Sequence, residues 1–189
     1  MIIGIDEVGR GCWAGPLVAA AVGFDGDVNI AELTDSKLLT AQKRIKLVVE
    51  IQATTEHIGI GWVWPREINE LGLTESIRLA MQRAINEITE IAERVIIDGN
   101  FNFLPHINGT EAIVKADGSV ASVSAASIIA KVARDTYMIK IAKKYPEYAF
   151  EKHVGYGTKL HIKALAKYGV LPLHRVNYKP IKKFLASSA

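Results

Sequence analysis

Four acidic residues stand where carboxylates are costly unless they bind something. Asp6 and Glu7 end the apolar run at residues 2–5, while Asp98 and Asp117 each end a later β-branched run and are followed by glycine. A solvated strand-to-turn junction would explain one such acid. Carboxyl ends of strands in an α/β chain meet at one edge of a sheet, so we expect these acids to converge. Crowded acids repel one another unless a cation lies between them.

The donor set indicates which cation this would be. Four carboxylates with no cysteine or paired histidine beside them form an all-oxygen site, which selects hard cations such as Mg²⁺ or Mn²⁺. Such ions are commonly shared with substrate phosphate oxygens, and two of them roughly 4 Å apart can drive an in-line displacement. The five histidines show no zinc spacing, so we expect them at the surface or beside the site. Phosphodiester cleavage is the predicted chemistry.

The elements that must hold these acids follow from hydrophobic periodicity. Residues 17–24 predict a strand antiparallel to the first one, and small residues at the start of the helix at 119–144 predict close packing on a sheet. The stretch at 69–93 predicts a short helix that turns into a long one. The remaining predicted elements are strands at 2–5, 57–64, 94–98 and 112–116 and helices at 40–54 and 159–168.

Composition restricts the class of protein. The chain has 189 residues, 49% of them hydrophobic, and a formal net charge of +3, which fits one globular domain and permits a polyanionic partner. The lysines concentrate toward the C-terminal end, where a nucleic-acid interface and a plain solvated surface explain them equally well. Cys12 is the single cysteine, no apolar run is long enough for a membrane span, and no signal peptide precedes Asp6. A cytoplasmic protein is expected.

Six sequence blocks together resemble one known family. They are Gly4-Ile5-Asp6-Glu7-Val8-Gly9-Arg10-Gly11, Asp35-Ser36-Lys37, Ile97-Asp98-Gly99-Asn100, Lys115-Ala116-Asp117, Ser124-Ala125-Ala126-Ser127-Ile128-Ile129-Ala130-Lys131-Val132-Ala133-Arg134-Asp135 and Gly155-Tyr156-Gly157-Thr158. In this order, from residue 2 to about 178, they resemble the bacterial type 2 ribonuclease H family, ribonuclease HII. Each block alone is weak, whereas the ordered set is highly specific.

The resemblance implies an α/β fold of the ribonuclease H-like type, a mixed sheet flanked by helices, with a small helical C-terminal part. It implies a catalytic core at 1–150 and a segment at 151–189 that packs on the core and is not an independent domain. Matched by position, the resemblance implies that the metal-binding and catalytic acids are Asp6, Glu7, Asp98 and Asp117. It implies that the loop of Gly9, Arg10 and Gly11 recognises the ribose 2′-hydroxyl. It also implies that Tyr156 stacks on the sugar that follows and that Lys37 contacts a phosphate. Glycine in that loop lets the backbone approach the sugar.

The implied activity is that of an endoribonuclease with Mg²⁺ or Mn²⁺, two ions when substrate is bound. Its substrates would be RNA/DNA hybrids and single ribonucleotides embedded in duplex DNA, cut on the 5′ side to leave 3′-hydroxyl and 5′-phosphate ends. This implies a role in removing ribonucleotides from DNA. We expect a monomer with no membrane association.

Two departures and two alternatives accompany this expectation. Val154 and Leu38 stand where many relatives have lysine, so we expect weaker and more salt-sensitive nucleic-acid binding at most.

One alternative keeps the fold but cleaves DNA or transfers strands, as transposase-like proteins do. The other is a non-catalytic module that binds hybrids, in which the acids are structural.

Overall fold

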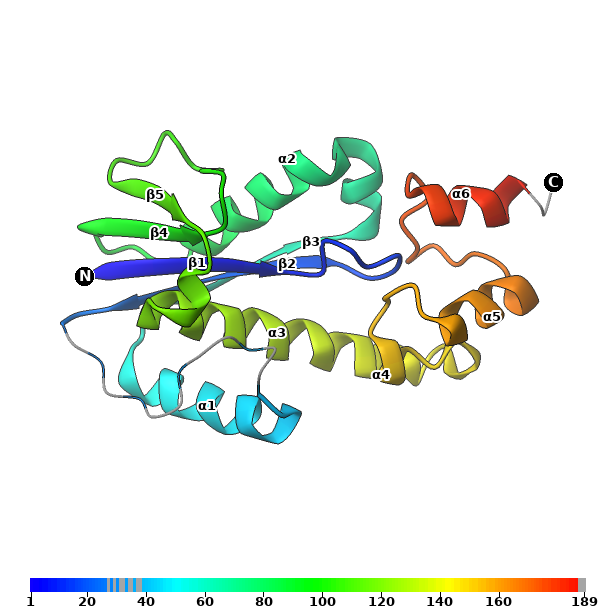
Figure 1. The fold of residues 1–189 in the computed structure, drawn as a ribbon, viewed down its shortest axis with the longest axis horizontal. Helices are drawn as coiled ribbons and strands as arrows, with labels where there is room; N and C mark the ends of the chain where they lie inside the picture. The colour runs from blue at the N-terminus through cyan, green and yellow to red at the C-terminus, as the bar shows by residue number, and fades with distance from the viewer. Residues whose placement is uncertain (27, 29, 31–32, 34–35, 37–38, 187–189) are drawn as a thin grey trace.

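The computed structural model describes residues 1–26, 28, 30, 33, 36 and 39–186. Its centre is one five-stranded sheet in the order β3-β2-β1-β4-β5 (Figure 1). Strand β1 lies in the middle, antiparallel to β2 and parallel to β4, while β3 pairs antiparallel with β2 and β5 pairs parallel with β4. The strands are β1 (Ile2–Val8), β2 (Leu17–Phe24), β3 (Ile58–Val63), β4 (Arg94–Asp98) and β5 (Thr110–Ile113). The mixed sheet predicted for this chain is confirmed.

Helices cover both faces of the sheet. Helix α2 (Pro65–Ile85) packs on one face, and α1 (Ala41–Thr54) and α3 (Ala121–Ala142) pack on the other (Figure 1). The contact between β1 and α3 is very close, because a Cβ on Gly4 would lie 2.2 Å from the backbone nitrogen of Val123. Glycine therefore allows α3 to run directly across the strand that carries the first two acids.

Three predicted boundaries are wrong for identifiable reasons. The strand expected at 57–64 ends at Val63, and Pro65 already begins α2, because proline fits the first helical position, where no backbone N–H is needed. The helix spans Pro65–Ile85, not 69–93, and the predicted change from a short to a long helix is confirmed by a break at Gly72, with φ 77°. The strand expected at 112–116 ends at Ile113 and is followed by a 3₁₀ turn, η2 (Ala116–Gly118).

The C-terminal part lies at one end of the molecule and shares a hydrophobic cluster with α3. Its elements are η3 (Pro146–Tyr148), α4 (Phe150–His153), α5 (Lys159–Tyr168) and α6 (Lys179–Ala186). The predicted helix at 159–168 is confirmed, with a side-chain cap from Thr158 and an end at Gly169. Met138 of α3 is fully buried in the cluster together with Phe150 and Ile181. The part therefore packs on the core through α3.

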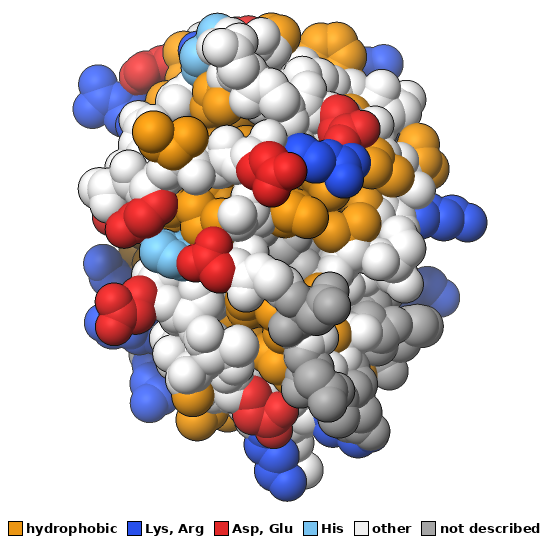
Figure 2. Space-filling model, turned by 90° about the vertical axis from the view of Figure 1, so that its left-hand side faces the viewer, with side chains coloured by type: hydrophobic (Ala, Val, Ile, Leu, Met, Phe, Trp, Pro, Cys, Tyr) orange, Lys and Arg blue, Asp and Glu red, His pale blue; other side chains and the backbone are white. Residues whose placement is uncertain are grey.

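The opposite end of the molecule, where the N-terminus lies, carries side chains of both charges (Figure 2). Acidic and basic side chains are scattered there with hydrophobic ones between them (Figure 2). This visible face therefore presents no uniformly basic surface to a polyanion. Among the described helices, none combines the length and the hydropathy needed to cross a membrane.

Candidate active site

Asp6 and Asp98 lie beside each other because of strand register. Ile5 of β1 pairs with Ile97 of β4 in parallel, so the next residue on each strand points to the same face of the sheet. One carboxylate oxygen from Asp6, one from Asp98 and one from Asp117 all lie within 4.8 Å of one another. The predicted convergence of acids from three distant segments is confirmed for these three residues.

Asp117 reaches the cluster by a different route from the one predicted. It does not end a strand but lies, buried, in η2, which follows a left-handed residue, Lys115, with φ 60°. Two hydrogen bonds fix this turn: the Ala116 N–H donates to Asp98 Oδ1 at 2.8 Å, and the Ser124 hydroxyl of α3 donates to the Asp117 carbonyl at 2.6 Å. One of the acids therefore helps to hold the turn that carries another.

The carboxyl group of Asp6 is strongly perturbed. Burial, followed by the negative charge of Glu7, raises the pKa of Asp6 from 3.8 to about 7, although a hydrogen bond from Ser127 acts in the opposite direction. The Glu7 N–H also donates to Asp6 Oδ1 at 2.7 Å. A buried acid that ionises with this difficulty is stabilised by a cation, so the electrostatics favour a metal ion here.

Glu7 lies at the edge of the cluster. Strand β1 continues through Val8, so it does not turn at the two acids, and neighbouring side chains on a strand alternate in direction. The carboxylate of Glu7 pairs with the Arg10 guanidinium at 3.2 Å. Burial raises the pKa of Glu7, Arg10 lowers it and the charge of Asp98 raises it further, so Glu7 still interacts electrostatically with the acid cluster.

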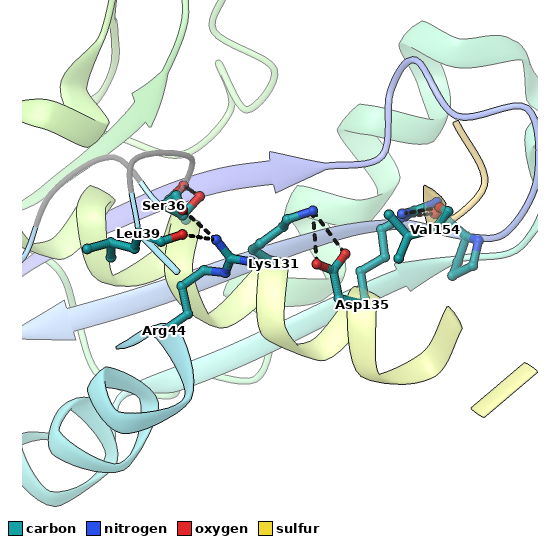
Figure 3. A network of polar contacts seen from close by, with 9 residues as sticks. Ser36, Leu39, Arg44, Lys131, Asp135 and Val154 are labelled. Carbon is teal, nitrogen blue, oxygen red and sulfur yellow. Dashed lines mark hydrogen bonds and ion pairs between the residues drawn. The ribbon is translucent and has the colours of Figure 1, made fainter. Parts of the chain in front are cut away.

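A hydrogen-bonded chain connects Asp6 to the segment before α1. The Ser127 and Ser36 hydroxyls lie 2.9 Å apart, and Ser127 also bonds the Asp6 carboxylate. Arg44 of α1 holds this segment by donating to the carbonyls of Ser36 at 2.9 Å and Leu39 at 2.6 Å (Figure 3).

The sequence prediction for this region was incomplete. The serines of α3 were interpreted only as small residues that permit close packing, whereas Ser124 and Ser127 also fix the acids. Their spacing of three residues on one helix, shortly after Asp117, is the signal that could have identified them. Lys37 and Leu38 lie outside the described residues.

The loop after β1 packs against a buried arginine, Arg134, of α3. Gly9 has φ 97°, and a Cβ there would lie 2.4 Å from Arg134 Nε. Arg134 is fully buried and donates to three main-chain carbonyls, those of Pro16, Ala14 and Val154. Its neighbour on the helix, Lys131, pairs with Asp135 instead. Gly9 therefore has no space for a side chain, whereas Arg10 and Gly11 are exposed.

Tyr156 lies next to this loop. Its ring is 40% exposed, and its Cε1 atom lies 3.9 Å from the position that a Cβ would take on Gly11. Tight packing against Trp13 holds the tyrosine segment, because a Cβ on Gly157 would lie 2.1 Å from the Trp13 ring and the Trp13 N–H donates to the Gly155 carbonyl at 2.8 Å. The Gly-Arg-Gly loop and the tyrosine, distant in sequence, form one exposed surface.

Three histidines form a buried cluster beneath Tyr156, so the expectation that they lie at the surface or beside the acids is wrong for them. His161 and His174 are fully buried, and the rings of His153 and His161 stack with centroids 4.6 Å apart. His161 Nδ1 lies 3.0 Å from the Tyr156 carbonyl, and its Nε2 lies 3.0 Å from His174 Nε2. His174 Nδ1 in turn lies 2.8 Å from the Leu171 N–H.

Burial lowers the pKa of His161 and of His174 to about 4, so both rings are neutral near pH 7 and each carries one proton. A carbonyl only accepts, so His161 carries its proton on Nδ1 and its Nε2 accepts from His174 Nε2–H. His174 Nδ1 then accepts from the Leu171 N–H. The Leu171 carbonyl, 3.1 Å from the same nitrogen, then accepts no hydrogen bond from it.

The donor set fits a divalent metal ion. Three carboxylates from β1, β4 and η2 offer hard oxygen ligands within 4.8 Å of one another, as Mg²⁺ and Mn²⁺ require. Two of these acids are buried, with Asp6 8% and Asp117 6% exposed, which limits access of bulk water to their charges.

Comparisons with known proteins agree with this site. The sequence model of the family described as Ribonuclease HII matches residues 3–181. Ribonuclease HII of Shewanella amazonensis is 42% identical over 192 residues, which cover all of this chain and 91% of that protein, and the protein of that name from Shewanella pealeana is 46% identical over 97% of this chain and 90% of its own.

Solved structures share the fold. The ribonuclease H2 from Pyrococcus horikoshii OT3 superposes with a TM-score of 0.84 at 28% identity and covers 98% of this chain and 97% of its own. Bst-RNase HIII in complex with Mn²⁺ has a TM-score of 0.73 at 22% identity over 99% of this chain and 70% of its own, a likeness of fold. The chain therefore belongs to the ribonuclease HII family of metal-dependent endoribonucleases that act on RNA/DNA hybrids.

Proposed function

We propose that this enzyme cleaves RNA/DNA hybrids and single ribonucleotides embedded in duplex DNA, on the 5′ side of the ribonucleotide, and so acts in removing ribonucleotides from DNA. The observation that carries the proposal is the meeting of Asp6, Asp98 and Asp117 within 4.8 Å, beside an exposed glycine loop. In the proposal these acids and Glu7 hold Mg²⁺ or Mn²⁺. Two bound ions would stabilise the attacking water and the leaving oxygen, which gives 3′-hydroxyl and 5′-phosphate ends.

The protein residues contribute positioning and selectivity. Ser127 and the Glu7 N–H orient the Asp6 carboxylate, and Ala116 orients that of Asp98. No side-chain nucleophile is required, because water attacks the phosphodiester. The burial of the acids strengthens their interaction with any cation they bind.

The loop of Gly9, Arg10 and Gly11 is proposed to recognise the ribose 2′-hydroxyl. Arg10 and Gly11 are exposed, and the absence of a Cβ on Gly11 lets a sugar approach its backbone. Tyr156, at the same surface, would stack on the sugar that follows the ribonucleotide. The phosphate contact assigned to Lys37 stays a prediction.

We further propose that the enzyme acts as a monomer and that residues 151–189 do not form an independent domain. The second proposal is supported by Leu165 and Ile181, which are buried in a cluster with Met138 of α3. Exposed lysines at 159, 163 and 167 fall on neighbouring turns of α5, where they can face a nucleic-acid backbone.

A cleavage assay tests the function. Duplexes with one, four or no ribonucleotides are incubated with Mg²⁺, Mn²⁺ or a chelator, and the product ends are mapped. We expect cutting only where a ribonucleotide is present, only with metal, and with a 3′-hydroxyl on the 5′ product. Asp117→Asn should abolish cleavage, whereas Asp135→Asn, outside the cluster, should retain most of it.

The same assay separates the alternatives. Equal cutting of the all-DNA duplex would overturn the proposal in favour of a DNA-cleaving or strand-transferring enzyme. Retained function in Asp6→Asn and Asp117→Asn would favour a non-catalytic module that binds hybrids. Loss of cleavage with retained hybrid binding in those variants is the result expected of an enzyme.

A further inference from the structure

The carbonyl of Arg10, in the exposed loop, is held by two residues from the C-terminal part. Arg175 Nη1 donates to this oxygen at 3.1 Å and the Tyr178 hydroxyl donates to it at 2.8 Å. Arg175 Nη1 also donates to the Tyr178 hydroxyl at 3.0 Å, so the three groups form a closed triangle of hydrogen bonds. The Arg10 carbonyl is thereby turned toward the protein.

Arg175 is suited to this task because it is completely buried and its other donors are also engaged. Its Nε and Nη2 donate to the Gly15 carbonyl at 3.2 and 3.1 Å. The planar guanidinium thus connects Gly15 with Arg10 and fixes the distance between the two ends of the loop. A lysine, whose ammonium is a single point of charge, cannot reproduce this fork.

The orientation of this carbonyl determines where the next N–H points. The described residues contain no cis peptide bond, so the C=O of Arg10 and the N–H of Gly11 lie on opposite sides of one planar peptide. With the oxygen held by Arg175 and Tyr178, the Gly11 N–H points away from them. Gly11 is exposed, and within the described part of the chain its N–H has no acceptor, although the Tyr156 ring lies beside it.

We propose that Arg175 and Tyr178 are positioning residues for ribonucleotide selectivity, because they aim the Gly11 N–H at the ribose 2′-hydroxyl. This inference rests on the proposed function, in which the loop recognises that hydroxyl. Neither residue touches the substrate; each acts through the peptide between Arg10 and Gly11. Selectivity for the sugar therefore depends on contacts between the loop and the C-terminal part.

Tyr178→Phe is the decisive variant, because it removes one hydroxyl and keeps the ring. Without that donor the peptide is less firmly oriented, so we expect kcat/KM on a duplex with one ribonucleotide to fall by about fivefold, the effect of one weakened hydrogen bond. The Kd for an all-DNA duplex, which has no 2′-hydroxyl, should stay within about twofold. Arg175→Lys should lower the same kcat/KM by roughly tenfold or more, since it removes the guanidinium that holds the Arg10 and Gly15 carbonyls together.

The matched control is Tyr168→Phe, which removes an exposed hydroxyl from the same part of the protein and should change neither quantity. A purely structural role of Tyr178 would lower the melting temperature or weaken both duplexes equally, and either result would overturn the inference, as would an unchanged kcat/KM. Failure of the proposed function is recognised separately, because the unmodified enzyme would then not distinguish the ribonucleotide duplex from all-DNA.

Discussion

At the scale of single residues, the site is built from charges that destabilise the protein until a cation arrives. Asp6 is buried beside Glu7 and within a few ångströms of Asp98 and Asp117, and burial raises its pKa to about 7. Local hydrogen bonds from Ser127 and the Glu7 backbone only partly offset this. The protein is therefore less stable without metal than it would be without these charges, as is common where function requires buried charge.

The variant Asp6→Asn should consequently be more stable than the unmodified protein when metal is absent. A carboxyl whose pKa is raised from 3.8 to about 7 destabilises the fold above pH 7, and this effect disappears as the pH falls toward 3.8. With a chelator at pH 8, urea denaturation should show a gain of about 2–4 kcal/mol in the free energy of unfolding.

That gain should shrink as the pH falls from 7 to 5, while cleavage activity is lost at every pH. Asp135→Asn serves as the control and should show no gain, because its carboxylate is paired with Lys131. If Asp6→Asn were no more stable than the unmodified protein at pH 8, the buried Asp6 carboxylate would not destabilise the fold.

At the scale of elements, much of the positioning could be predicted from local pattern. The strand at 17–24, the helix at 159–168 and the convergence of Asp6 with Asp98 follow from apolar periodicity and from acids at strand ends. The prediction that Asp117 joins the acids is confirmed, but Asp117 lies in the turn η2 and not at the end of a strand. Strand β5 is short and only partly buried, so its end cannot be read from hydrophobicity, and the left-handed Lys115 that begins the turn has no sequence signal.

The segment that carries Tyr156 should be sensitive to one methyl group. In Gly157→Ala the new Cβ would lie 2.1 Å from the rigid Trp13 ring, so either the ring or the tyrosine segment must move. We expect a loss of about 1–3 kcal/mol in stability and a lower rate on single-ribonucleotide duplexes, measured by thermal unfolding and cleavage.

The double variant Trp13→Leu/Gly157→Ala provides the control. Leucine removes the ring that the new methyl group would meet, so the double variant should lose less stability than the sum of the single losses. Strict additivity would contradict the predicted clash.

At the scale of the whole molecule, the C-terminal part contacts and holds the exposed surface formed by the loop after β1 and Tyr156. Arg175 holds the loop after β1, and the chain from Leu171 through His174 and His161 ends on the Tyr156 carbonyl. The Arg175 contact joins residues 165 positions apart, so no local pattern predicts it. The histidine chain lies within residues 156–174 and depends on how these segments pack together. The histidines were noted for lacking zinc spacing, but their burial depends on tertiary packing alone.

The histidine chain predicts a loss of stability in mild acid. Histidines with an unfolded pKa of 6.5 and a folded pKa of about 4 contribute stability that is complete above pH 6.5 and is lost as the pH falls toward 4. Urea denaturation should show a loss of about 2 kcal/mol per histidine between pH 7.5 and pH 5.

The raised pKa values of Asp6 and Glu7 make stability rise as the pH falls over this range, opposite to the effect of the histidines. The experiment is therefore done in the Asp6→Asn/Glu7→Gln variant. Nuclear magnetic resonance titration of the rings should show His161 and His174 still neutral at pH 5. A ring that titrates near pH 6.5, or stability that is constant down to pH 5, would disprove the direction of these bonds.

The central claim is that acids from β1, β4 and η2 together bind a divalent metal ion. Anomalous diffraction from a crystal soaked in Mn²⁺ tests this most directly. The account predicts a peak among the carboxylates of Asp6, Asp98 and Asp117, at roughly 2.0–2.3 Å from their oxygens, that disappears in Asp98→Asn. A soaked crystal with manganese bound elsewhere and none among these three acids would contradict it.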